Sequence, residues 1–145
     1  MSDTSIRDCV RQLRIELQIV NDKVASTAGL NPRDLDVLDV IDREGPCTPS
    51  HLAIRTGLPR ATLTGVLARL EQQQWIDRER HPADGRSAQL RSTDRFDELR
   101  RLYRPMTEAT KALTDRLSPQ ERDLLERMLT DLVTAVRKSH PGAVD

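Results

Sequence analysis

The chain has 145 residues, with 23 basic and 23 acidic side chains and one each of Trp, Tyr and Phe. This length fits a single domain with one core, and the shortage of aromatic residues predicts aliphatic packing between helices. The balanced charge argues against a protein that coats nucleic acid without sequence preference.

The two cysteines, Cys9 and Cys47, are too few for a disulfide framework and lack the spacing of a metal site. We therefore expect no metal ion and no cofactor. No apolar run approaches the roughly 20 residues of a membrane-spanning helix, and the N-terminus lacks the pattern of a secretory signal. These features predict a cytoplasmic protein with no membrane partner.

The first 45 residues predict two helices. Apolar residues recur every three or four positions over residues 4–26, which indicates an amphipathic helix. Asn31-Pro32 then begins a second helix, and Gly45-Pro46 ends it. Leu38 and Ile41 on the second helix are expected to pack against the segment that follows.

Residues 48–93 predict two short helices followed by a hairpin. Thr48 caps a helix that begins with Pro49, and Gly57 ends it. Pro59 precedes a second helix, whose apolar side is Leu63, Val66, Leu67 and Leu70. Two short strands then flank a turn with the sequence Pro82-Ala83-Asp84-Gly85-Arg86. This order is that of a helix-turn-helix with a wing, and the segment is locally basic, with 7 Lys or Arg against 4 Asp or Glu.

The last third of the chain predicts two more helices. One long helix runs from the region of Leu99 to Leu117, with a kink near Arg101 to Pro105 because proline removes a helical hydrogen bond. Ser118, with Glu121 three residues later, forms a capping box for a final helix.

The terminal helices carry more apolar surface than a small winged helix needs. We therefore expect residues 4–26 and 94–138 to form a dimerisation region around a winged helix-turn-helix at 32–93, in a single domain of residues 1–145. A two-fold homodimer suits a palindromic DNA site. The alternative is a helical bundle within one chain.

The order and spacing of several short motifs resemble the MarR family of bacterial transcription regulators. They are Leu52-Ala53, Gly57-Leu58, Arg69-Leu70-Glu71, Ile76-Asp77-Arg78 and Asp84-Gly85-Arg86. The resemblance implies a mainly α fold with a β-hairpin wing, in which the helix from Arg60 to Gln74 enters the major groove. It also implies that Arg86, oriented by Asp84, contacts the minor groove or its phosphates. Gln74 stands where the family commonly has a glycine.

The candidate DNA-binding residues are Ser50, Arg60, Ala61, Thr62, Thr64, Gly65, Arg69, Asp84 and Arg86. Arg60 suits a guanine base or a phosphate, and the threonines suit phosphates or thymine methyl groups. Gly65 removes a base-reading side chain but permits a close backbone approach. The resemblance also suggests Cys9 as a redox sensor, although burial as a small apolar residue is the favoured interpretation. Trp75 is expected in the core.

These features predict a dimeric repressor that binds double-stranded DNA and responds to a small-molecule effector or to oxidation. Catalysis is not expected, because His51, His81 and His140 lie on different elements without a partner constellation. The alternative function is a dimeric helical interaction protein that has lost specific DNA binding.

Overall fold

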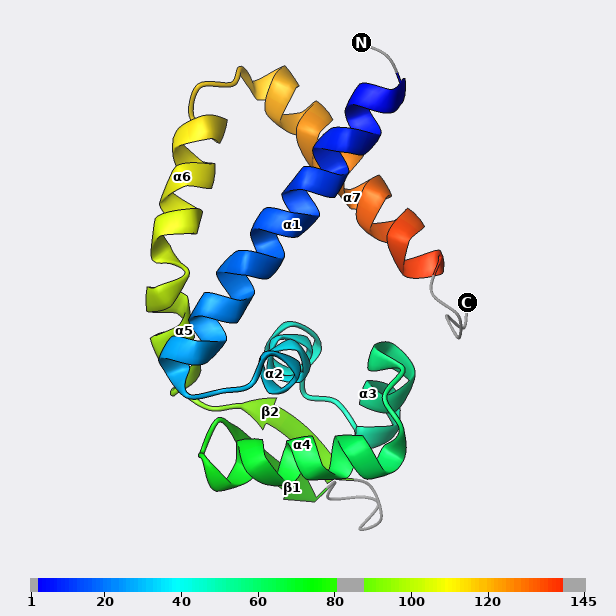
Figure 1. The fold of residues 1–145 in the computed structure, drawn as a ribbon, viewed down its shortest axis with the longest axis vertical. Coiled ribbons are helices and arrows are strands. Elements are labelled where there is room, and N and C mark those ends of the chain that lie inside the picture. The colour runs from blue at the N-terminus through cyan, green and yellow to red at the C-terminus, as the bar shows by residue number, and fades with distance from the viewer. Residues whose placement is uncertain (1–2, 81–87, 140–145) are drawn as a thin grey trace.

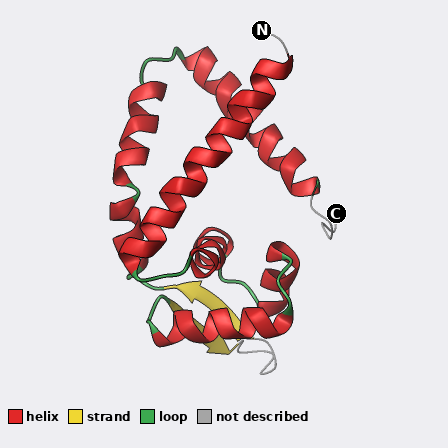
Figure 2. Ribbon diagram, in the orientation of Figure 1, coloured by secondary structure: helices red, strands yellow, loops and turns green. Residues whose placement is uncertain are grey.

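The computed structural model describes residues 3–80 and 88–139, over which helices predominate and one two-stranded antiparallel sheet is present (Figures 1 and 2). The predicted fold class is therefore confirmed. The elements are α1 (Asp3–Ala28), α2 (Pro32–Glu44), α3 (Pro49–Thr56), α4 (Arg60–Gln72), β1 (Ile76–Arg80), β2 (Ala88–Ser92), α5 (Phe96–Leu102), α6 (Arg104–Thr114) and α7 (Pro119–Lys138).

Side-chain caps begin three of the helices at the residues that the sequence predicts. The Asn31 side chain accepts the Asp34 N–H at 2.8 Å, and the Thr48 hydroxyl accepts the His51 N–H at 3.1 Å. Ser118 and Glu121 form the reciprocal capping box of α7. These bonds satisfy backbone donors that lack a helical partner, so they fix where each helix begins.

The turn between α3 and α4 depends on a glycine. Gly57 has φ 68° and its N–H donates to the carbonyl oxygen of Ala53 at 3.0 Å, which ends α3. A left-handed conformation of this kind carries little penalty for a residue without Cβ. The turn places α4 across the end of α3 in the lower half of Figure 1.

Helix α4 ends at Gln72, two residues before the predicted end at Gln74. Gln74 adopts φ 62°, so the chain leaves the helix through a left-handed residue. Gln74 stands where the family commonly has a glycine, and its backbone is left-handed. This conformation is strained because a residue with a Cβ pays a steric penalty in it.

The hairpin strands pair from Ile76 opposite Ser92 to Arg80 opposite Ala88. Cys47 adds an isolated bridge to Leu90, with N–H···O distances of 3.0 and 2.8 Å in the two directions. The segment between α2 and α3 is thereby attached to the hairpin. The predicted turn falls within residues 81–87, which lie outside the described residues.

The core lies between α2, α3, α4 and the hairpin. Its fully buried members include Trp75, which confirms the packing role expected for that residue. Leu38 and Ile41 of α2 are also buried there, as predicted. From α1 the buried residues are Val24 and Ala25, near its C-terminal end.

The region around Pro105 contains two helices where the sequence predicted one kinked helix. Helices α5 and α6 are separated at Tyr103, and Pro105 occupies the first turn of α6. Proline has no N–H to donate to the carbonyl of Arg101, and its ring clashes with the preceding turn. The predicted interruption is present as a one-residue break at Tyr103, whose backbone stays in the right-handed helical region.

The terminal helices extend away from the core in Figure 1 and leave apolar side chains exposed. Helices α6 and α7 have no buried residue, so the single chain does not close a bundle around them. The large exposed apolar residues on α1 and α7 are Ile6, Val10, Leu13, Ile15, Leu17, Ile19, Leu124, Met128, Leu129, Leu132, Val133 and Val136. None of the described helices is long and apolar enough to cross a membrane.

Candidate nucleic-acid interface

Helix α4 has one buried side and one presented side. Leu63, Val66, Leu67 and Leu70 face the core. Arg60, Ala61 and Thr64 are exposed on the other surface, with Thr62 and Gly65 half-buried at its border. The positions predicted to contact DNA on this helix therefore lie together on the solvent side or its edge.

A hollow of about 150 Å³ between α3 and α4 brings three predicted site residues together. Ser50 from α3 lines it with Arg60 and Thr64 from α4. The Thr64 hydroxyl donates to the carbonyl oxygen of Arg60 at 2.9 Å, which orients the threonine along the helix. Hydroxyl groups beside a guanidinium are suited to phosphate and base-edge contacts.

Gly65 leaves open space on α4. A Cβ built at this position meets only the Nη1 atom of Arg69, at 3.5 Å, which is an ordinary van der Waals contact. Packing within the chain does not require glycine here. The absence of a side chain instead permits a partner to approach the helix backbone closely.

Arg69 is held by a carboxylate. Its Nε and Nη2 atoms donate to the two oxygens of Asp34, each at 2.8 Å. This is the two-pronged geometry in which a guanidinium binds a carboxylate most firmly. Arg69, predicted to contact DNA, therefore has an intramolecular charged partner that was not predicted from the sequence.

Glu44 at the end of α2 collects basic groups from two other helices. It accepts hydrogen bonds from Arg55 Nε and His51 Nε2 of α3, each at 2.8 Å, and lies 3.7 Å from Nη2 of Arg137 on α7. Burial raises the pKa of Glu44, but the hydrogen bonds from Arg55 and His51 outweigh it and lower the pKa overall. Arg55 and His51 thus stabilise the placement of α3 on α2.

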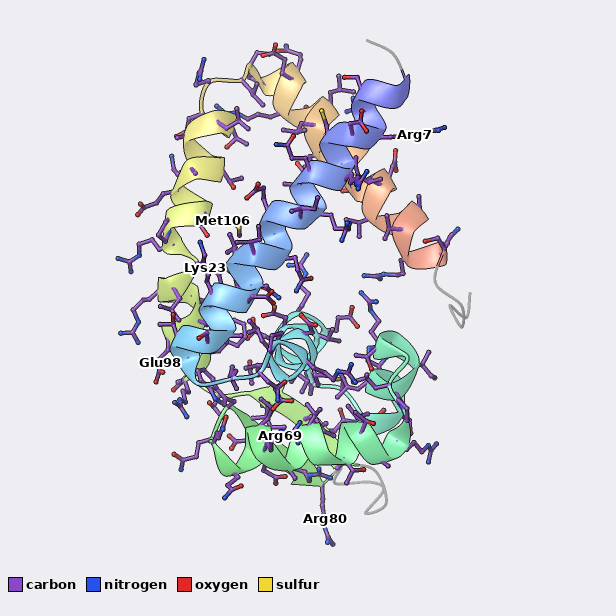
Figure 3. The ribbon with its side chains drawn as sticks, in the orientation of Figure 1. Arg7, Lys23, Arg69, Arg80, Glu98 and Met106 are labelled. Carbon is purple, nitrogen blue, oxygen red and sulfur yellow. The ribbon has the colours of Figure 1, made fainter. Side chains whose placement is uncertain are left out.

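The strands of the hairpin carry three arginines, Arg78, Arg80 and Arg91, that are not among the predicted DNA contacts. Arg78 lies 3.5 Å from Glu71, and Arg91 lies 3.6 Å from Glu79. Arg80, the last residue of β1, projects away from the body of the protein (Figure 3). The sequence signal that could have identified Arg80 is its position two residues before Pro82, which begins the predicted turn. Asp84 and Arg86 lie outside the described residues.

The two cysteines, Cys9 and Cys47, are both free and do not form a disulfide with each other. Cys9 is exposed on α1, so the burial expected for it does not occur within the chain, whereas Cys47 is buried. Burial raises the pKa of the Cys47 thiol. In the described part of the chain, no group of three or more His, Cys, Asp or Glu residues is placed to hold a metal ion.

A polar cluster joins α1, α2 and the break between α5 and α6. Tyr103 donates its hydroxyl to the Asn21 side chain, which in turn donates to Asp36 at 3.1 Å. Burial, followed by the nearby carboxylates of Asp36 and Asp42, raises the pKa of Asp39 to about 6. Burial also raises the pKa of Tyr103.

A larger hollow, of about 510 Å³, opens between the end of α2, α6 and α7. Three apolar side chains of α7 line it together with five polar or charged side chains, two of which are arginines. The lining residues are Arg43, Thr114, Arg122, Leu125, Glu126, Leu129, Thr130 and Val133.

Known proteins with related sequences are transcription regulators. The HTH-type transcriptional regulator MT0903.1 of Mycobacterium tuberculosis (strain CDC 1551 / Oshkosh) is 33% identical over 110 residues, covering 74% of this chain and 75% of that protein. PecS of Dickeya dadantii (strain 3937) is 30% identical over 112 residues, covering 74% of this chain and 68% of PecS.

Solved structures share the fold. Transcriptional regulator Tm0710 from Thermotoga maritima superposes with a TM-score of 0.68 at 23% identity, covering 94% of this chain and 96% of that one. FabT of Streptococcus pneumoniae, solved in complex with DNA, gives 0.69 at 20% identity, covering 96% and 100%.

A family model described as the MarR family matches residues 28–87, which include α2, α3, α4 and β1. This match coincides with the helix-turn-helix and the first wing strand. Together with the relatives above, it shows that the chain belongs to the MarR family of winged helix-turn-helix transcriptional regulators.

Proposed function

We propose that this regulator binds double-stranded DNA through the exposed side of α4. The observation that carries the proposal is the grouping of Arg60, Thr64 and Ser50 around one hollow on the solvent side of the helix-turn-helix. The opposite side of α4 is fully committed to the core. A helix with one anchored side and one polar side is the form that enters a major groove.

The individual residues have distinct roles in this proposal. Arg60 contacts a base edge, because arginine pairs with guanine through two hydrogen bonds. Thr62, Thr64 and Ser50 contact phosphates or thymine methyl groups, and Ser50 lies in the first turn of α3, where the helix dipole favours anions.

The remaining predicted contacts lie near the helix backbone and in the wing. Ala61 and Gly65 keep side chains short where the α4 backbone approaches the groove. Arg86, oriented by Asp84, contacts the minor groove or its phosphates from the wing. FabT, which has the same fold, was solved in complex with DNA, and this supports DNA binding by a chain of this fold.

The regulator acts as a homodimer. Exposed apolar side chains on α1 and α7 recur at helical spacing, and burying them against a second copy removes this surface from water. A two-fold dimer presents two α4 helices to a palindromic operator. The dimer covers promoter DNA and so represses transcription.

A small-molecule effector, or oxidation at the exposed Cys9, changes DNA affinity by favouring one spacing of the two α4 helices. An effector has this result only if it binds one spacing more tightly than the other. The hollow between α2, α6 and α7 supports an effector site, since it joins the dimerisation helices to the end of α2.

The test is fluorescence anisotropy of the purified protein with labelled DNA from upstream of its own gene, and with scrambled DNA, over a series of salt concentrations. We expect preferential binding to the upstream DNA that weakens steeply as salt rises, because phosphate contacts release counterions. Equal binding to both DNAs would contradict sequence-specific recognition. No binding at low salt would instead support an interaction protein without DNA affinity.

A further inference from the structure

Asp34 is the buried charged residue of the described core, and its partner is a residue of α4. The Asp34 side chain is 4% exposed, whereas the Arg69 side chain is 48% exposed. Both carboxylate oxygens accept from Arg69 at 2.8 Å. The ion pair therefore joins a buried carboxylate to a long, half-exposed side chain of α4. Arg69 is labelled on this helix in Figure 3.

The backbone around Asp34 keeps the carboxylate in place. Its N–H donates to the N-cap side chain of Asn31 at 2.8 Å, and the next residue, Leu35, is fully buried. The backbone of Asp34 is thus fixed in the first turn of α2 and cannot carry the carboxylate outward. The arginine must instead lie where the carboxylate holds it, and the hydrogen bonds to Asp34 raise the pKa of Arg69.

Arg69 lies one helical turn after Gly65, and its Nη1 atom is 3.5 Å from the point that a Cβ of Gly65 would occupy. The guanidinium thus rests beside the part of α4 that has no side chain. An arginine released from Asp34 has an open path across Gly65 to the presented surface. An arginine held by Asp34 directs Nε and Nη2 toward the protein.

We propose that Asp34 is a specificity-determining residue, which withholds the charge of Arg69 from DNA. This inference rests on the proposed DNA-binding function of α4. A mobile arginine on α4 adds a phosphate contact that strengthens binding to every sequence alike, and so dilutes discrimination. Pairing with a buried carboxylate neutralises that charge, while Arg60 remains available to a base.

The first experiment compares the wild type with Asp34→Asn on random-sequence duplexes over a salt series. The substitution keeps the side-chain shape and removes the charge that holds Arg69. We expect several-fold tighter binding to random DNA at 50 mM salt. The slope of the logarithm of the binding constant against the logarithm of the salt concentration should become steeper by about 0.9 for each α4 helix bound to DNA. The ratio of specific to random affinity falls accordingly.

Two further variants identify the cause. Asp36→Asn removes the same charge from the same helix but not a partner of Arg69, since Asp36 accepts from Asn21. We expect it to leave the salt dependence near that of the wild type. Asp34→Asn combined with Arg69→Gln should lose the added salt dependence. A gain in Asp36→Asn equal to that in Asp34→Asn, or no gain in either, would overturn the proposal.

A measurement on the wild type covers the case in which Asp34→Asn fails to fold. Nuclear magnetic resonance of arginine Nε–H groups should show the Arg69 signal unmoved on addition of DNA, while the Arg60 signal shifts. A large shift at Arg69 would overturn the proposal. If the wild type binds no duplex at all, the proposed function fails as well; if it binds but Asp34→Asn shows no gain, only the role of Asp34 fails.

Discussion

The hydroxyl of Thr93 donates a 2.7 Å hydrogen bond to the carbonyl oxygen of Gln74, which is the left-handed residue that follows α4. The N–H of Thr93 also donates to the carbonyl oxygen of Trp75 at 3.0 Å. The junction after β2 therefore holds the exit of α4 in place. These bonds maintain a backbone conformation that glycine would adopt without strain.

Replacing Gln74 with glycine should stabilise the protein. Left-handed strain of about 1–2 kcal/mol is released, and the added backbone entropy of glycine in the unfolded chain offsets about 0.5–1 kcal/mol of it. We expect a gain of roughly 0.5 kcal/mol in the free energy of unfolding, measured by urea denaturation. Gln73→Gly is the matched control, because Gln73 has φ −83° and nothing to relieve. Gln73→Gly should lower stability, and an equal effect of both variants would contradict the release of backbone strain at Gln74.

Trp75 is fully buried, and its Nε1–H has no hydrogen-bond partner among the described residues. The Arg95 guanidinium covers its ring, 4.1 Å from the centroid. Trp75→Phe should cost less than about 2 kcal/mol, because a phenyl ring keeps most of the apolar contact and leaves no donor unpaired. Trp75→Ala should cost about 3–5 kcal/mol. Circular dichroism during denaturation measures both, and a loss in Trp75→Phe as large as that in Trp75→Ala would contradict the small cost expected for Trp75→Phe.

Asp39 makes stability depend on pH. Its folded pKa of about 6 is raised above the ordinary 3.8 by burial, so the folded state binds a proton more readily than the unfolded state. The ionised carboxylate therefore destabilises the protein above pH 6. The upper bound of this effect at neutral pH is about 3 kcal/mol, and the actual effect is smaller because the group is only partly buried.

Asp39→Asn should consequently be more stable than the wild type at pH 7.5, with an advantage that disappears between about pH 6 and pH 4. Thermal denaturation over that range measures the difference. Asp8→Asn, on the exposed part of α1, serves as the control and should follow the wild-type curve. A constant difference between Asp39→Asn and the wild type would refute the predicted titration.

Leu129 is 47% exposed on α7 and belongs to its apolar stripe. Leu129→Asp should shift the protein from dimer to monomer in sedimentation velocity, because a charge buried in an apolar contact carries a large desolvation penalty. The helical content should remain, since the residue contributes little to the core of the single chain. Thr134→Asp adds the same charge to the opposite side of α7 and should leave the dimer intact. Dissociation by both variants would argue against this stripe as the interface.

Local signals predicted most of the fold. Thr48, Gly57 and Ser118 act on backbone groups within four residues of themselves, so the chain alone indicates where those helices begin and end. The buried side of α4 was equally predictable from its spacing. Pro105 indicated an interruption, although the extent of the break depends on packing around Tyr103.

Ion pairs between residues far apart in the sequence could not be predicted from local sequence patterns. Asp34 and Arg69 are separated by 35 residues, and nothing near either residue indicates that they meet. The same holds for Glu44, which contacts Arg55 and Arg137 from different helices. Arg69 was therefore predicted as a DNA contact from its position on α4 alone. The burial expected for Cys9 failed because the apolar stripe of α1 extends beyond the core of the single chain.

Arg60 is the residue on the exposed side of α4 on which the proposed recognition of DNA sequence most depends. Duplexes selected by the wild type from a random library are compared with unselected duplexes by anisotropy, for the wild type, Arg60→Ala and the control Arg127→Ala on α7. We predict that Arg60→Ala narrows the ratio of selected to unselected affinity by about 5- to 150-fold, which corresponds to roughly 1–3 kcal/mol for a guanine contact. Arg127→Ala should leave that ratio unchanged. An unchanged ratio for Arg60→Ala would contradict base recognition by this residue.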